Sequence, residues 1–88
     1  MSKKPKLTGR QINMWEHTGW GDAIHWRDFQ KRKLYGHLYE RPKLGDIINS
    51  EMQSGKVGQF VVVEVEYMRD PPDQFFCKVS DFGYKEKH

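Results

Sequence analysis

The segment Gln59–Met68 constrains the fold more than any other, because its side chains alternate as they do in a β-strand. The apolar members recur at every second position and are Val61, Val63, Val65 and Tyr67. Glu64 and Glu66 fall between them, so the pattern predicts one face in a core and one face in solvent.

A second alternating run follows after a short break in the chain. Asp70-Pro71-Pro72-Asp73 must form a loop, since prolines cannot donate the hydrogen bonds of a β-ladder. Phe75, Cys77 and Val79 then alternate again. We therefore expect a long C-terminal β-hairpin, with these three side chains in the same core as the alternating valines.

Upstream, the residues from Lys33 to Tyr39 also alternate, and Arg41–Asp46 then breaks the pattern, which predicts a strand followed by a turn. The preceding stretch, Asp22–Leu34, is ambiguous. It is compatible with a short helix near residues 22–31 that is capped by Asp22 and carries Trp26 on its apolar face. It is equally compatible with a strand, and we expect a helical turn followed by a strand.

A chain of 88 residues is of single-domain length and can bury only a thin core. Hydrophobic residues make up 36% of the chain and aromatic residues 14%, so a few large rings must supply much of the burial. We expect a mainly β fold, a small SH3-like or PUA-like barrel. Residues 1–6 are polar and basic and predict a flexible tail, and residues 7–88 predict one β-rich domain.

The single cysteine, Cys77, cannot form an internal disulfide or a cysteine-based zinc site, and it fits a reducing, cytoplasmic environment. It lies on the apolar face of its strand, so a buried, inert thiol is expected. No apolar run reaches the length of a membrane span, which predicts a protein without a membrane partner.

Charge is distributed unevenly along the chain. Met1–Leu44 holds 10 Lys/Arg against 4 Asp/Glu, a charge of +6, whereas Gly45–His88 holds 5 against 8, a charge of −3. A basic N-terminal half predicts a surface that meets phosphates or an acidic protein.

Aromatic and basic residues are interleaved in this basic half, as nucleic-acid surfaces require. The leading hypothesis is therefore a non-catalytic module that binds RNA or DNA. Its candidate residues are Arg27, Lys31, Arg32, Lys33, Arg41, Trp26, Tyr35 and His37.

Two other functions use overlapping residues. A protein-interaction module, acting as a regulator or inhibitor of a larger partner, would use Trp15, Trp20 and Trp26 as anchors. A nucleotide-processing enzyme would need convergent titratable groups, and the chain offers few. His17, His25 and His37 lack the spacing of a metal site, so we expect neither a metal nor another cofactor.

The order of motifs from Lys33 to Tyr67 resembles the ASCH branch of the PUA-like β-barrels, which have RNA-associated or nucleotide-processing roles. The likeness lies in Lys33-Leu-Tyr-Gly36-His37-Leu38, in Arg41-Pro42-Lys43-Leu44-Gly45-Asp46-Ile47-Ile48 and in the valine-rich strand. The acid and the arginine that flank the family's strand glycine are here Tyr35 and His37. The resemblance thus implies the fold rather than the activity, with Lys33 and His37 facing a ligand cleft.

Overall fold

β-Strands form most of the protein in a computed structural model, which describes residues 6–19, 22–52, 55–69 and 74–86. In chain order the elements are β1 (Gln11–Asn13), a 3-10 helix η1 (Met14–Glu16), β2 (Thr18–Gly19), β3 (Asp22–Asp28), β4 (Lys33–His37), β5 (Ile47–Glu51), β6 (Lys56–Tyr67) and β7 (Gln74–Glu86). The expected mainly β class is confirmed. Residues 1–5 of the predicted tail and the predicted loop at Asp70–Asp73 lie outside the described residues.

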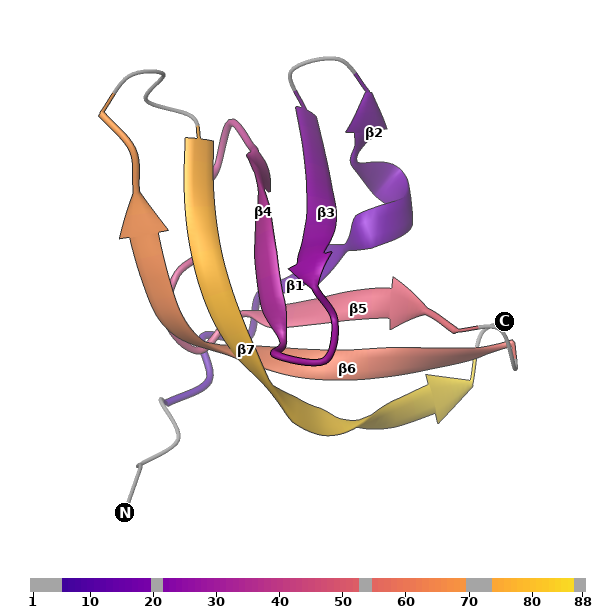
Figure 1. The fold of residues 1–88 in the computed structure, drawn as a ribbon. Coiled ribbons are helices and arrows are strands. Elements are labelled where there is room, and N and C mark those ends of the chain that lie inside the picture. Colours follow the sequence, from indigo (N-terminus) through magenta and orange to yellow (C-terminus); the bar gives the residue numbers. More distant parts are fainter. Residues whose placement is uncertain (1–5, 20–21, 53–54, 70–73, 87–88) are drawn as a thin grey trace.

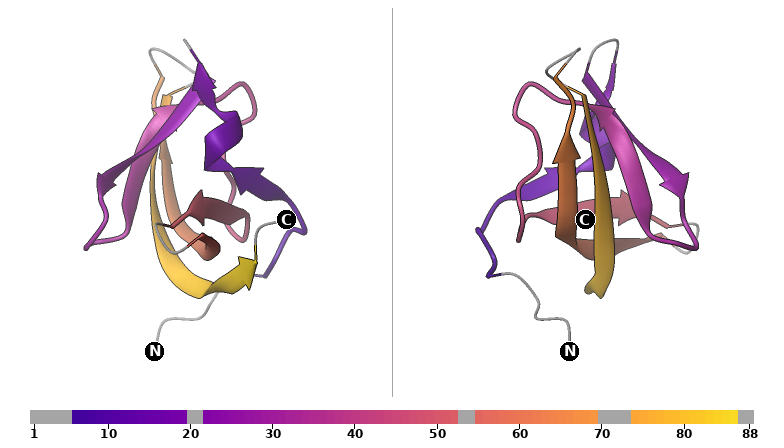
Figure 2. Two further views of the ribbon diagram at one scale, coloured as in Figure 1. Left: turned by 90° about the vertical axis from the view of Figure 1, so that its right-hand side faces the viewer. Right: turned by 60° about the vertical axis from the view of Figure 1, so that its left-hand side comes forward.

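All seven strands belong to one sheet, in the order β1-β5-β6-β7-β4-β3-β2. The pair β1–β5 is parallel and every other pair is antiparallel. The sheet curls into a half-barrel, and η1 connects the two strands that form its edges (Figures 1 and 2).

The long hairpin of β6 and β7 lies in the middle of this sheet and confirms the predicted C-terminal hairpin. Strand β5 pairs with the first part of β6, from Val57 to Val61. Strand β4 pairs with the first part of β7, from Gln74 to Lys78. Because these partners join opposite ends of the hairpin, the sheet must bend along it (Figure 1).

A β-bulge at Val63 corrects the predicted burial pattern of β6. Val62 pairs with Val79, but the next paired residue of β6 is Glu64, opposite Lys78, so Val63 is an extra residue. Such a bulge shifts the alternation by one position and increases the local bend. The expectation that Val61 and Val63 face the same core as Val65 was therefore wrong.

The main core instead takes Val62 before the bulge and Val65 after it. Val61 is buried on the opposite side of the sheet, opposite Ile47, and Val63 is half-buried. Tyr67 is 41% exposed, which also departs from the prediction. Phe75, Cys77 and Val79 are buried, and Glu64 and Glu66 are exposed, as expected.

Residues 22–28 form the strand β3, so the helical alternative for this segment was wrong. Ile24 lies opposite Gly36 and is buried, and Trp26 lies opposite Leu34 and packs against the core. A Cβ added at Gly36 would lie 2.2 Å from the backbone oxygen of Ala23, so only glycine lets β3 approach β4 this closely. Pairing with β4 therefore outweighs the local preference for a helical turn.

The hydrophobic core lies inside the curl of the sheet and draws on all strands except the two-residue β2. Its buried members are Ile12, Ile24, Leu34, Leu38, Ile48, Phe60, Val62, Phe75, Cys77 and Val79. Four of these side chains have no exposed surface, so the centre of the core is closely packed; they are Phe75, Leu34, Ile48 and Val62.

Asp46 holds the segment before β1 against the rest of the domain. Its buried carboxylate accepts hydrogen bonds from the Thr8 hydroxyl, from Arg10 Nη1 at 3.3 Å and from the backbone N–H of Lys43 at 2.9 Å. The backbone oxygen of Lys6 lies so close to Gly45 that a Cβ there would approach it to 2.0 Å. The backbone of Lys6 therefore packs against the turn that precedes β5.

Candidate functional site

Strand β4 presents three of the predicted binding residues on the outer face of the sheet. Leu34 and Leu38 are buried in the core, so alternation turns Lys33, Tyr35 and His37 outward. Lys33 and Tyr35 are exposed, and Tyr35 retains 37% of its surface. The outward orientation of these three side chains therefore follows from the burial of Leu34 and Leu38.

Neighbouring strands add a row of rings on either side of Tyr35. On β3, His25 lies opposite Tyr35, with ring centroids 5.5 Å apart. On β7, Phe76 lies opposite Tyr35 and is half-buried. We call His25, Tyr35 and Phe76 the aromatic row.

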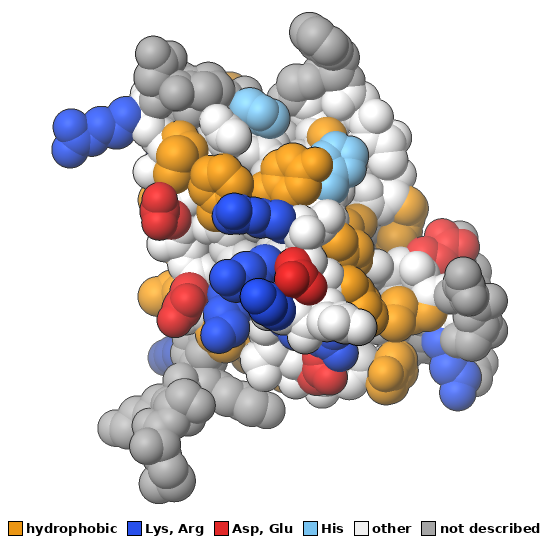
Figure 3. All heavy atoms as spheres, viewed as in Figure 1, with side chains coloured by type: hydrophobic (Ala, Val, Ile, Leu, Met, Phe, Trp, Pro, Cys, Tyr) orange, Lys and Arg blue, Asp and Glu red, His pale blue; other side chains and the backbone are white. Residues whose placement is uncertain are grey.

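A parallel row of positive charges lies beside the aromatic row. Lys33 is directly opposite Lys78 of β7, and both side chains are exposed. Arg27 lies at an irregularity in the pairing of β3 with β4, and its guanidinium carbon lies 5.3 Å from the centroid of the Phe76 ring. We call Arg27, Lys33 and Lys78 the cationic row. Hydrophobic and basic side chains lie next to one another on this face in Figure 3.

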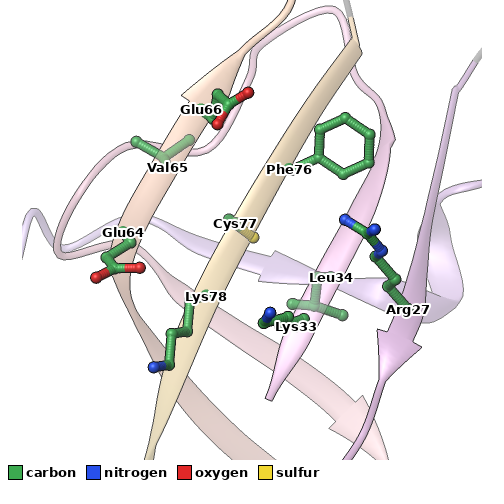
Figure 4. Close-up of a pocket in the computed structure, with 9 residues that line it drawn as sticks. All are labelled: Arg27, Lys33, Leu34, Glu64, Val65, Glu66, Phe76, Cys77 and Lys78. Atoms are coloured by element: carbon green, nitrogen blue, oxygen red, sulfur yellow. The ribbon is translucent and has the colours of Figure 1, made fainter. Parts of the chain in front are cut away.

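The cationic row and Phe76 of the aromatic row line a hollow of about 400 Å³ on the outer face of β3, β4, β7 and β6. Its basic side is the cationic row, and its acidic side consists of Glu64 and Glu66 of β6 (Figure 4). The remaining lining residues are Leu34, Val65, Phe76 and Cys77. A volume of this size is within the usual range of small-ligand sites.

The cations of this face form no ion pairs within the described part of the chain, although Asp28 of β3 lies opposite Lys33 in the ladder. Among the described residues, no acidic oxygen lies within 4.0 Å of the side-chain nitrogens of Arg27, Lys33 or Lys78. Glu64 lies opposite Lys78 in the ladder without forming such a contact. The charge of the cationic row is therefore available to an anion from outside.

Other predicted binding residues have structural partners instead. Arg32 forms a two-pronged ion pair with Asp81, with Nε–Oδ1 at 2.6 Å and Nη2–Oδ2 at 3.4 Å. Its guanidinium also stacks on Phe29, with 4.4 Å from its carbon to the ring centroid. The Asp81 carboxylate raises the pKa of Arg32, and Arg32 lowers the pKa of Asp81. Arg32 thus ties the β3–β4 turn to β7.

Lys31 and Arg41 lie outside the hollow. Lys31 is exposed in the β3–β4 turn. Arg41, in the connection between β4 and β5, stacks on Tyr67 with 4.2 Å from its guanidinium carbon to the ring centroid. Of the basic residues predicted for nucleic-acid binding, only Arg27 and Lys33 are brought together in the hollow.

The structure describes two of the three predicted tryptophan anchors, Trp15 and Trp26. Trp26 points to the inner side, stacks edge-on against Phe60 and donates a hydrogen bond from Nε1 to Ser50 Oγ at 3.3 Å. Trp15 is in η1 and 36% exposed, and Trp20 lies outside the described residues. Trp26 therefore packs against the core from β3.

Phe76 and Lys78 belong to the hollow but were not among the predicted site residues. Both alternate with the buried Phe75, Cys77 and Val79, a pattern from which their outward orientation could have been deduced. Their place beside Lys33 and Tyr35 depends on the pairing of β4 with β7, which no local pattern indicates.

Cys77 is the only thiol that borders the hollow, and it is 5% exposed. Burial raises its pKa to about 12, so the thiol is protonated at neutral pH. A protonated thiol is a poor nucleophile, and Cys77 is a core residue, as expected from the sequence.

The described residues include no group of three or more His, Cys, Asp or Glu side chains arranged to hold a metal ion. None of the helices in the described part of the chain is long and apolar enough to cross a membrane. No protein-family model matches the chain, and comparisons with curated proteins and with solved structures also found no match.

Proposed function

We propose that this protein is a binding module for single-stranded nucleic acid, and that the aromatic and cationic rows form its binding surface. The observation that carries the proposal is the position of three cations, which form no ion pair in the described part of the chain, beside three rings on adjacent strands of one open face. Phosphates and unpaired bases are the two chemical groups that such neighbouring rows bind together.

Each row has a separate role in this proposal. Lys33, Lys78 and Arg27 attract the phosphate backbone, which supplies affinity without sequence information. Tyr35 and Phe76 offer ring faces for stacking, worth about 1–3 kcal/mol for each base. Stacking needs bases that are not already paired, so the surface favours a single strand over a duplex.

Binding without catalysis agrees with the side chains around the hollow. Cys77 is buried and protonated, and Glu64 and Glu66 are exposed carboxylates on the outer side of β6. The resemblance of Lys33–Tyr67 to the ASCH and PUA-like barrels, which have RNA-associated or nucleotide-processing roles, implies the fold rather than an activity. Lys33 borders the hollow and His37 is on the same side of β4, consistent with the cleft residues that the resemblance implies.

The experiment is a fluorescence-anisotropy titration of the protein against labelled single-stranded RNA, single-stranded DNA and a duplex, across a range of salt concentrations. We expect the single strands to bind more tightly than the duplex, with an affinity that falls linearly with salt on a log–log plot. The double variant Lys33→Ala/Lys78→Ala should flatten the slope by about 1.4, the value for two phosphate contacts on a single strand.

The matched control removes the same charge elsewhere. Lys43 and Lys56 are exposed and lie outside the hollow, so Lys43→Ala/Lys56→Ala should keep most of the affinity and slope. Absence of binding at about 50 mM salt would exclude the nucleic-acid function. The rows would then be assigned to the alternative, a protein partner with an acidic surface, whose capture should also depend on Lys33 and Lys78.

A further inference from the structure

Glu66 is at the end of the aromatic row, directly opposite Phe76 in the β6–β7 ladder. Glu64, two residues earlier on the same face, lies opposite Lys78, at the end of the cationic row. The two carboxylates thus have the same charge and exposure but different neighbours. A negative charge on a surface that binds phosphates weakens that binding unless the carboxylate contacts the ligand by another route.

We infer that Glu66 reads the edge of a base stacked on Phe76 and gives this site a preference for guanine. The inference rests on the proposed function. Residues opposite each other on antiparallel strands have Cβ atoms about 4.5–5.5 Å apart, so the Glu66 carboxylate is at the edge of a base stacked on Phe76. Phe76 and Glu66 both line the hollow (Figure 4).

Guanine is the base whose hydrogen-bonding edge matches a carboxylate. Its N1–H and N2–H₂ groups are adjacent donors, and a carboxylate has two acceptor oxygens and no donor. Adenine and cytosine each place a ring-nitrogen acceptor next to their amino group. Uracil places carbonyl oxygens on both sides of its single N–H. Each of these bases would therefore bring an acceptor against the Glu66 carboxylate, which disfavours it.

The proposed binding mode also explains the arrangement of charge around the hollow. Phosphates lie along Arg27, Lys33 and Lys78, and the base points across Phe76 toward β6. In this mode Glu66 meets the hydrogen-bond donors of the base, and the phosphates stay on the basic side. Figure 4 shows Arg27 and Lys33 on β3 and β4, Glu64 and Glu66 on β6, and Lys78 on β7 between them.

The test uses short oligouridine probes that carry one central guanosine, inosine, adenosine or cytidine, with plain oligouridine as reference. A two-contact base interaction discriminates by about 1–3 kcal/mol, so guanosine should bind roughly 5- to 150-fold more tightly than adenosine, cytidine or uridine. Inosine keeps N1–H and lacks the N2 amino group, so its affinity should be intermediate.

Two isosteric variants separate base reading from charge. Glu66→Gln should reduce the preference for guanosine to less than about threefold, because the amide replaces one acceptor by a donor. Glu64→Gln removes the same charge and should keep the full preference. Equal binding of all probes by the parent protein would overturn the guanine inference and leave the proposed function intact. The guanine inference would also be overturned if Glu64→Gln lost the preference for guanosine or if Glu66→Gln kept it. Failure of every probe to bind would instead overturn the proposed function.

Discussion

Lys33 of β4 and Lys78 of β7 lie directly opposite each other on antiparallel strands, with both side chains on the outer face of the sheet. Like charges in this position destabilise a sheet. Asp28 of β3 lies opposite Lys33 on its other side, and Glu64 of β6 lies opposite Lys78. Each lysine therefore has one like-charged and one oppositely charged cross-strand neighbour.

Lys33→Glu should leave the free energy of unfolding almost unchanged and abolish nucleic-acid binding. The substitution converts the like-charge pair with Lys78 into an opposite-charge pair and the opposite-charge pair with Asp28 into a like-charge pair. Each change is worth about 0.2–1 kcal/mol, so the two offset each other. Urea unfolding measures the first effect and anisotropy the second. Lys43→Glu, in an exposed loop, is the control and should change stability by less than about 0.5 kcal/mol. A change in the stability of Lys33→Glu by more than about 1 kcal/mol in either direction would contradict the charge argument.

Tyr35→Ala and Phe76→Ala should each weaken binding to single strands by about 1–3 kcal/mol through lost stacking, with the salt slope almost unchanged. Tyr35→Phe keeps the ring and should bind nearly as well as the parent. Tyr39 is 98% exposed and is not part of the aromatic row, so Tyr39→Ala is a control for the loss of an aromatic side chain. Equal losses for Tyr35→Ala and Tyr39→Ala would argue against the aromatic row.

The adjacent residues Lys31, Arg32 and Lys33 should separate into three phenotypes. Arg32→Ala loses the ion pair with Asp81 and the contact with Phe29, and it leaves alanine at a positive φ of 57°. It should cost about 1–2 kcal/mol of stability, measured by chemical unfolding. Lys31→Ala should affect neither stability nor binding much, and Lys33→Ala should reduce binding alone. Equal loss of affinity in all three variants would show that the basic run acts as a unit.

Burial of Cys77 should make the protein less stable in alkali. The folded state holds the thiol proton up to a pKa of about 12, whereas an unburied thiol has a pKa of 9.0. The unfolded chain thus loses its proton first, so stability is full below about pH 9 and falls toward pH 12 by up to about 1.4 kcal/mol per pH unit.

Other groups also titrate in alkali, so the measurement compares the parent with Cys77→Ala at each pH. The stability advantage of the parent should shrink between about pH 9 and 12. A thiol reagent should react slowly with the native protein at neutral pH and rapidly after unfolding. Fast labelling of the native state would contradict the buried position.

The bulge in β6 predicts that two adjacent valines differ in their contribution to stability. Val62 has no exposed surface and lies in the core, whereas Val63 is the half-buried extra residue. Val62→Ala should cost about 1–3 kcal/mol, from the transfer of the lost methyl groups and the cavity that remains. Val63→Ala should cost clearly less in the same urea titration. The reverse order would contradict this register.

The sequence by itself determined the strands whose alternation is uninterrupted. Buried Leu34 and Leu38 dictate that Lys33, Tyr35 and His37 face outward, and the apolar positions of β7 were predicted correctly. Alternation is a local property, because successive side chains of a strand point to opposite faces whatever the strand pairs with. Half of the proposed binding surface could therefore be predicted from the sequence.

Only the tertiary structure decided which strands are neighbours and where their register shifts. The placement of Lys78 beside Lys33 depends on the pairing of β7 with β4, two strands far apart in the chain. The exchange of Val63 for Val62 in the core depends on a bulge that the hairpin needs in order to bend. Segment 22–28 became a strand because Gly36 allows it to approach β4. These outcomes arise from contacts between distant segments, and no pattern within one segment encodes them.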